Sequence, residues 1–297
     1  MEQEKTKTDR FWNFYDKNYK RLLLIPIILL IFSFAYVGYF YTQTGDFFYK
    51  DISLTGGTTV TIYDNIDKGV LENEVSDDLE NLNTRYIYDL VTNEKKAIII
   101  ETTTGTNKTK STLEDFLDYK LDSENSSFQF TGSTLSQSFF RQLLMAIVFA
   151  FIFMAIVVFI IFRIFIPSAA VIISAFADIF MSLTLVNLLG IELSTAGIVA
   201  FLMLIGYSVD TDILLTTRVL KRREGSINER IARSFKTGIT MTLTSVLAFT
   251  LALIVVQSFS VVLSQIFTIL IIGLGFDILN TWITNTSIIK WYAESRK

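Results

Sequence analysis

Six apolar stretches, each long enough to cross a bilayer at about 20 helical residues, constrain this chain more than any other feature. The first covers residues 22–41, and the other five cover 139–162, 167–189, 194–216, 239–256 and 261–284. Hydrophobic residues make up 51% of the chain, which fits a protein embedded in lipid. The sequence therefore predicts a polytopic α-helical membrane protein with six transmembrane helices in a 1+5 arrangement.

The chain contains no Cys and no His. Disulfides, zinc–thiolate sites, thiol nucleophiles and histidine-based catalytic triads are thereby excluded. Proton handling near neutral pH would fall to carboxylates held in environments that favour the neutral form. We expect no metal and no cofactor, and we expect that the protein is not an enzyme.

Loop charge orients the helices, because short loops rich in Lys and Arg stay in the cytoplasm. The 1–21 tail, the turn at Arg163, the 217–238 loop and the C-terminus are basic, whereas the turns "GIELS" and "QSFS" carry no basic residue. This alternation predicts a multi-pass protein of the cytoplasmic membrane with both termini in the cytoplasm. The insert between the first and second helices then lies outside.

The 42–138 insert has a soluble composition and is long enough for a small domain. Its apolar residues change between a period of about 2 and a period of about 3.6, in the order β-α-β-β-α-β. That order predicts an external ferredoxin-like α+β domain ahead of a five-helix domain at 139–297. The predicted strands are 58–64, 85–91, 96–104 and 127–132, and the predicted helices lie near 68–82 and 110–121.

Short motifs mark this insert. Gly56 and Gly57, in "DISLTGG", are expected to let the backbone turn tightly into the first strand. Two glycosylation sequons begin at Asn107 and Asn125, and chance is the simpler explanation for both.

Four aspartates lie inside the predicted helices: Asp178, Asp210, Asp212 and Asp277. Carboxylates within a membrane normally face the bundle interior or a wet cavity, and they mark ion or proton paths. All four are therefore candidates for proton coupling. The simpler alternative is structural hydrogen bonding, because Ser174 and Ser182 flank Asp178 by one turn and Asp277 begins a stripe of polar residues, namely Asn280, Thr281 and Thr284.

Asp210 and Asp212 point about 200° apart on a helix, so they cannot both line one narrow path. Asp210 shares its face with Gly206, a small residue that permits close helix packing. We therefore expect Asp210 to be the interior carboxylate and Asp212 to be a boundary residue near the basic loop.

The segment "SINERIARSFKTGI" begins with a capping box formed by Ser226 and Glu229. Its apolar residues form one stripe, so the basic side chains are expected to face away toward anionic headgroups or a protein partner, if the segment is more than an ordinary surface helix. The candidate basic residues of this loop are Arg222, Arg223, Arg230 and Arg233.

The stretch "GYSVDTDILLTTRVLKRREG", together with an apolar helix bearing "AD" about 32 residues upstream, resembles the SecD/SecF family of protein-export membrane proteins. That family is a branch of the resistance-nodulation-division transporters. The resemblance covers nearly the whole chain. The small insert and the single six-helix unit resemble the SecF branch, and its archaeal members above all.

The resemblance implies an accessory subunit of the Sec translocase. Its implied partners are SecD in a heterodimer, the Sec translocon channel, exported polypeptide and membrane lipid, with no nucleic acid. Asp210 stands where the SecD-type motif has its aspartate, and Asp178 matches an aspartate of bacterial relatives. Thr211 stands where bacterial relatives typically carry Asp, and Asp277 has no clear counterpart. Proton coupling through these aspartates is therefore a hypothesis and not a direct implication of the resemblance.

The sequence leaves two alternatives open and argues against a third. The chain could be half of a small-molecule or lipid exporter of the same superfamily, or a passive translocon scaffold. An intramembrane aspartyl protease requires Gly-x-Gly-Asp, but Phe276 separates Gly275 from Asp277.

Overall fold

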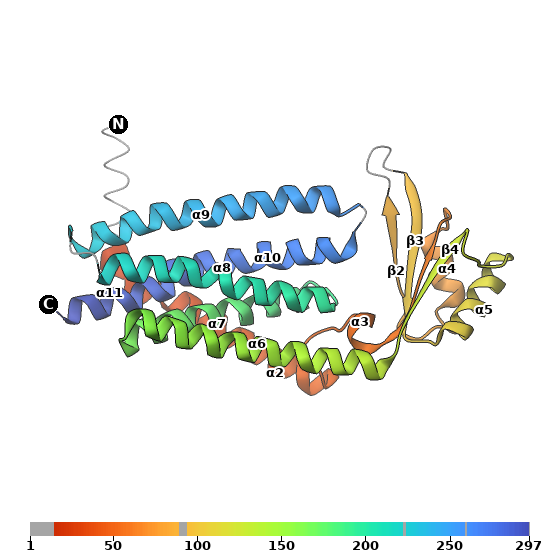
Figure 1. The fold of residues 1–297 in the computed structure, drawn as a ribbon, viewed down its shortest axis with the longest axis horizontal. Helices are drawn as coiled ribbons and strands as arrows, with labels where there is room; N and C mark the ends of the chain where they lie inside the picture. The colour runs from red at the N-terminus through yellow and green to blue at the C-terminus, as the bar shows by residue number, and fades with distance from the viewer. Residues whose placement is uncertain (1–14, 89–93, 222–223, 259, 297) are drawn as a thin grey trace.

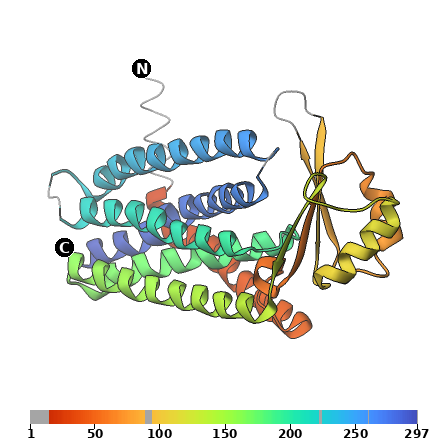
Figure 2. The same cartoon turned by 45° about the vertical axis from the view of Figure 1, so that its right-hand side comes forward.

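The computed structural model describes residues 15–88, 94–221, 224–258 and 260–296. A bundle of long helices makes up most of the molecule, and a small α+β domain stands at one end of it (Figure 1). The end of the bundle that carries this domain is its sheet-side end. Both ends of the described chain lie at the opposite end of the bundle (Figures 1 and 2).

Six helices of the described chain are long and apolar enough to cross a membrane, which confirms the predicted 1+5 arrangement. Residues 15–22 are helical and lead into the first of them. The last helix does not end at residue 284 but continues through a π-helical stretch. The bounds are α2 Leu24–Thr44, α6 Ser133–Phe162, α7 Phe165–Leu188, α8 Thr195–Leu220, α9 Ile227–Val256, α10 Val261–Leu279, the π-helix η1 Asn280–Asn285 and α11 Thr286–Ser295.

Helices α7 and α8 form the interior of the bundle, whereas α6 and α9 lie at its periphery. A shared apolar core joins α8 to α10 through Phe201, Leu204 and Leu270. Close packing there depends on Gly273, since a Cβ atom at that position would lie 2.3 Å from a methyl carbon of Leu204. The interior helices are thereby placed where buried polar side chains can meet.

The α+β domain has the element order β1 (Gly57–Ile62), α4 (Lys68–Val75), β2 (Asn83–Tyr88), β3 (Lys95–Thr102), α5 (Thr106–Leu117) and β4 (Ser126–Thr131). Its four strands are antiparallel in the order β2-β3-β1-β4, which confirms the ferredoxin-like arrangement. Residues 89–91 of the predicted second strand lie outside the described residues.

Alternation along the strands gives the sheet one apolar and one polar face. Val60, Ile62, Ile98 and Ile100 point toward helices α4 and α5 and form the domain core. The other face carries polar side chains and is turned toward the bundle (Figure 1). A polar sheet face therefore stands over the sheet-side ends of α8 and α10.

The entry to β1 requires glycine at two positions. Gly56 follows the short helix α3 (Ile52–Thr55) and has a φ of 87°, in the left-handed region. A Cβ atom on Gly56 would lie 2.5 Å from the Cα of Ser133, and one on Gly57 would lie 2.3 Å from the carbonyl oxygen of Thr102. Gly56 thus lets the chain pass close to the start of α6, and Gly57 lets β1 pass close to the end of β3.

Backbone hydrogen bonds attach the domain to the bundle. The segment before α3 pairs with the turn between α7 and α8, where Leu193 N donates to Tyr49 O at 2.7 Å and Asp51 N donates to Leu193 O at 3.0 Å. At the other edge, Tyr88 N donates to Ser258 O at 2.9 Å. The sheet is therefore held to the bundle on both sides of a central gap.

Candidate functional site

Three fully buried aspartates meet in the middle of the bundle, each on a different helix. Asp178 lies on α7, Asp212 on α8 and Asp277 on α10, and none of them has any exposed surface. The hydrogen-bond donors that reach these carboxylates in the described chain are neutral hydroxyl and amide groups. Since buried charge normally requires a cation or many donors, this cluster is the principal candidate site.

Asp178 and Asp277 are both held by donors from other helices. The Asp178 oxygens accept from the Ser208 hydroxyl and from Asn280 Nδ2, the latter at 2.7 Å. The Asp277 oxygens lie 3.1 and 3.3 Å from the Thr211 hydroxyl, whose one hydrogen they share.

Asp212 is linked to Asp277 by a single hydroxyl group. Thr281 Oγ1 lies 2.9 Å from Asp212 Oδ1 and 3.0 Å from Asp277 Oδ1. A threonine hydroxyl has only one hydrogen to donate, so it can serve one carboxylate as donor and the other as acceptor. Thr281 therefore connects the two acidic groups in a way that suits proton transfer.

The π-helix η1 supplies half of the residues that donate to the three carboxylates, namely Asn280, Thr281 and Asn285. Four of its six side chains, Asn280, Thr281, Thr284 and Asn285, are buried polar groups, and Asn285 Nδ2 donates to Asp212 Oδ1 at 2.7 Å. The widened turn is supported by Thr286, whose hydroxyl donates to the carbonyl of Thr281 at 2.8 Å. Because π-helical turns occur mostly as rare local insertions and often at functional sites, this one strengthens the candidate.

The predicted roles of Asp210 and Asp212 are reversed by the structure. Asp210 is exposed on the outer surface of α8, beside Gly206 and Tyr207, whereas Asp212 is buried. Helix geometry separated the two correctly by angle, but packing against α7 and α10 decides which face is inside. The prediction of Asp210 as the interior carboxylate was wrong.

The serines that flank Asp178 serve other acceptors. Ser182 donates to the backbone carbonyl of Asp178, and Ser174 lies 3.4 Å from Asp212 Oδ1. Asp178 instead depends on Ser208 and Asn280, which come from other parts of the chain. One-turn spacing could not reveal partners on neighbouring helices.

The predicted cap of α9 is present, because the Ser226 side chain accepts from Glu229 N at 3.2 Å. Arg233 is exposed on that helix, with its guanidinium 4.0 Å from Glu229. Arg230 does not simply face away as predicted, since its Nη1 donates to the carbonyl of Val219 at the end of α8. Arg222 and Arg223 lie outside the described residues.

A polar cleft of about 380 Å³ lies between the open face of the sheet and the ends of α8 and α10. Glu101 on β3 is 6% exposed there and forms an ion pair with Arg85 on β2. Burial raises the pKa of Glu101 to about 7, with Arg85 opposing and the nearby Asp51 and Glu192 carboxylates adding to the rise. Sequence analysis did not single out this pair, although strand alternation places both residues on the polar face.

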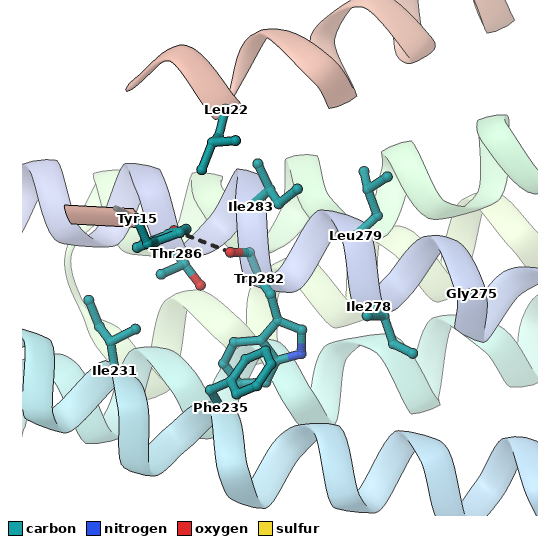
Figure 3. Close-up of a pocket in the computed structure, with 10 residues that line it drawn as sticks. All are labelled: Tyr15, Leu22, Ile231, Phe235, Gly275, Ile278, Leu279, Trp282, Ile283 and Thr286. Carbon is teal, nitrogen blue, oxygen red and sulfur yellow. Dashed lines mark hydrogen bonds between the residues drawn. The ribbon is translucent and has the colours of Figure 1, made fainter. Parts of the chain in front are cut away.

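A separate apolar groove of about 370 Å³ lies near the end of the bundle opposite the sheet (Figure 3). Its lining includes Trp282, Phe235 and Tyr15, and the Tyr15 hydroxyl donates to the Trp282 carbonyl at 3.2 Å. With so few polar groups the groove suits a hydrocarbon chain and not a charged solute. It is distinct from the aspartate cluster.

Comparison with known sequences gives a consistent result. A family model described as "Protein export membrane protein SecD/SecF, C-terminal" matches residues 111–295. Similar proteins include the protein-export membrane protein SecF of Methanocaldococcus jannaschii, 43% identical over 93% of this chain and 96% of the relative. The SecF of Haloquadratum walsbyi is 36% identical over 93% of this chain and 92% of the relative.

Comparison with solved structures agrees on the fold. The crystal structure of SecDF, a translocon-associated membrane protein from Thermus thermophilus, aligns with a TM-score of 0.72 at 17% identity. The alignment covers 93% of this chain but only 38% of the SecDF chain. A second SecDF structure, in a super-membrane-facing form, aligns with a TM-score of 0.62 at 16% identity.

Proposed function

The chain belongs to the SecD/SecF family of protein-export membrane proteins, and we propose that it is an accessory subunit of the Sec translocase that assists polypeptide export across the cytoplasmic membrane. Relatives that match over nearly their full length carry the name SecF. The chain spans 38% of a SecDF chain, so a second, larger subunit of the SecD type is the expected partner. The Sec channel and the exported polypeptide complete the assembly.

The surface for SecD is the outer face of α8 together with the adjoining face of α9. Arg218 Nη1 donates to Thr237 at 2.7 Å, so the two helices lie side by side. Asp210 on α8 and Thr240 and Thr244 on α9 are exposed along this surface. A carboxylate that faces lipid costs about 2.5–3.5 kcal/mol on insertion scales, and a partner helix with hydrogen-bond donors removes that cost.

The orientation we propose places the α+β domain outside and both termini in the cytoplasm, as the loop charges predict. The basic start of α9 then lies at the inner headgroups, and the apolar groove of Figure 3 faces the inner leaflet, where it can hold a lipid chain. The proposal includes no catalysis, no cofactor and no nucleic acid.

Export is coupled, in this proposal, to protonation of the aspartate cluster. The observation that carries it is the single Thr281 hydroxyl between Asp212 and Asp277. When Asp277 is the acid, its proton passes to Thr281 while the hydroxyl hydrogen of Thr281 passes to Asp212. Asp277 becomes a carboxylate, Thr281 is unchanged and Asp212 becomes an acid protonated on the oxygen next to Thr281. A half-turn of the carboxyl group then carries this hydrogen to the side away from Thr281.

The test is export of a reporter protein in cells that depend on this chain. Replacing Asp212→Asn is expected to reduce export strongly, because asparagine cannot accept and release the proton. Asp210→Asn tests the separate surface, and is expected to weaken recovery of SecD with the chain more than it disturbs the interior network.

Two other outcomes would contradict the proposal. Normal export by the Asp212→Asn variant, with no dependence on the proton gradient, would indicate a passive scaffold. Purification as a complex with itself and without SecD would indicate half of a small-molecule or lipid exporter.

A further inference from the structure

The two oxygens of Asp212 have unlike surroundings. Oδ1 accepts from Asn285 at 2.7 Å, from Thr281 at 2.9 Å and, more weakly, from Ser174 at 3.4 Å. Oδ2 is buried and has no hydrogen-bond partner among the described residues. An ionised carboxylate has equivalent oxygens that both seek donors, whereas a carboxylic acid has one carbonyl oxygen that accepts and one hydroxyl that donates.

The other two aspartates have no such orphaned oxygen. Both oxygens of Asp178 accept hydrogen bonds, and the two oxygens of Asp277 share the single Thr211 hydroxyl. Within the described cluster, the carboxylate oxygen that has no hydrogen-bond partner is Oδ2 of Asp212.

Asn285 carries the complementary group. Its Nδ2 already donates to Asp212 Oδ1, while its own Oδ1 is buried and has no partner in the described chain. A carboxamide and a carboxylic acid can form a two-bond pair, N–H to carbonyl and O–H to carbonyl. A single hydrogen on Asp212 Oδ2 would give both orphaned oxygens a hydrogen-bond partner. Buried polar groups in proteins normally have such a partner.

We infer that Asp212 holds the proton of the cluster in this conformation and that Asn285 is the positioning residue that responds to its loss. In the protonated state, Asp212 Oδ2–H donates to Asn285 Oδ1. When the proton leaves, two acceptors face each other and the Asn285 amide loses one of its two bonds to Asp212. The use of this pair in export rests on the proposed function, but the pair itself does not.

Asn285 is placed so that a change in its hydrogen bonds can be passed to the helix that follows it. It is the last residue of η1, and α11 begins at the next residue. Within α11, Lys290 is 1% exposed and forms an ion pair with Asp16 and a hydrogen bond at 2.9 Å to Asn228. A change at Asn285 thus acts on α11, which contacts both the first described helical residues and the start of α9 through Lys290.

Two carboxylates and three neutral donors surround Asp212. Asp178 on α7 and Asp277 on α10 are the carboxylates close enough to repel its charge, and Ser174, Thr281 and Asn285 are its neutral donors.

A small cation is the competing occupant. Thr216 lies one turn from Asp212 on α8, and its Oγ1 is also buried without a partner in the described chain. The orphaned oxygens of Asp212, Asn285 and Thr216 are of the type that binds small hard cations such as Na⁺. The experiment must therefore distinguish a bound Na⁺ from a proton on Asp212.

The test is infrared spectroscopy of the purified full chain in lipid nanodiscs at neutral pH. We expect a carbonyl stretching band of a buried carboxylic acid that disappears in Asp212→Asn. In Asn285→Ala and Asn285→Ser the same band should remain but move to higher frequency, because the acid has lost its acceptor. Asp178→Asn and Asp277→Asn should each retain a band of the Asp212 acid.

The inference is overturned if the band survives in Asp212→Asn, or if neither Asn285 variant shifts it. Loss of the band when KCl is exchanged for NaCl at constant pH would identify a cation site instead. These readouts do not involve export. If the wild type shows no such band but Asp212→Asn still abolishes export, the acid–amide pair alone is refuted. If the wild type shows the band but Asp212→Asn leaves export unaffected, proton coupling alone is refuted.

Discussion

The interior of the helix bundle and the cleft beneath the sheet both bury carboxylates, but they stabilise them differently. Three aspartates in the bundle are held by neutral hydroxyls and amides, whereas Glu101 in the cleft has the guanidinium of Arg85. Neutral donors can serve both the acid and the carboxylate form, since hydroxyls rotate. A fixed cation favours the carboxylate alone. In the bundle, a change of protonation leaves the donors able to serve the new form, whereas in the cleft it makes or breaks the ion pair of Glu101 with Arg85.

The largest effect is expected from Asp178→Val in the bundle. It leaves the Ser208 hydroxyl and the Asn280 amide buried without their acceptor. Each orphaned group costs about 1–3 kcal/mol, so the free energy of unfolding should fall by roughly 2–6 kcal/mol. Unfolding of the purified chain in nanodiscs measures this, with Asp178→Asn as the milder control. Equal stability of the valine variant and the wild type would show that these donors do not depend on Asp178.

The next largest effect is expected in how the free energy of unfolding depends on pH, through Glu101 in the cleft. The pKa of Glu101 is raised from 4.5 to about 7, so the folded chain binds this proton more tightly than the unfolded chain does. The stabilisation is complete below pH 4.5 and is lost as pH rises through about 7. At about 1.4 kcal/mol per pKa unit the full change is at most about 3.5 kcal/mol.

Unfolding measured across that pH range should show the slope in the wild type and a flatter profile in Glu101→Gln. Asp115→Asn is the matched control, because Asp115 is an exposed carboxylate on α5, away from the cleft. A profile unchanged by Glu101→Gln would assign the slope to another group.

Removal of the cation should have a smaller effect that depends on pH. Arg85→Met leaves Glu101 without its ion-pair partner, which costs about 1.5–3 kcal/mol above pH 7. Below pH 4.5 the loss should be much smaller, because Glu101 is then neutral. Unfolding at the two pH values tests this, with the exposed Lys108→Met as control. A loss of equal size at both pH values would contradict the ion-pair interpretation.

The smallest effect on stability is expected from Asp210→Asn. The side chain is exposed on α8, so the free energy of unfolding of the isolated chain should change by no more than about 0.5 kcal/mol. The same variant should lower the yield of SecD recovered with the chain. A large loss of stability without its partner would show that Asp210 supports the fold of this chain itself.

Much of the architecture follows from local patterns. Helix lengths come from apolar stretches, and the ferredoxin-like order comes from the change between strand and helix periods. The Ser226 cap is likewise a short-range feature that the sequence reveals directly. Each of these depends on residues close together in the chain.

The candidate site depends on information that local patterns lack. The angle between Asp210 and Asp212 is a property of one helix, but the choice of the buried one is made by α7 and α10. Asn285 lies five residues beyond Asn280, and the π-helical turn lets both reach buried carboxylates on different helices. A regular helix, assumed in reading the sequence, does not place them so.

Helix α6 has a mechanical consequence. Its 30 residues begin at Ser133, one residue after β4 ends, and run without interruption to Phe162 at the far end of the bundle. At 1.5 Å per residue it is about 45 Å long, so a tilt of about 5° at one end displaces the other by about 4 Å. Few of its side chains are buried, which leaves it room to tilt. A tilt of α6 would therefore move the edge of the sheet, because only Gly132 separates β4 from the helix.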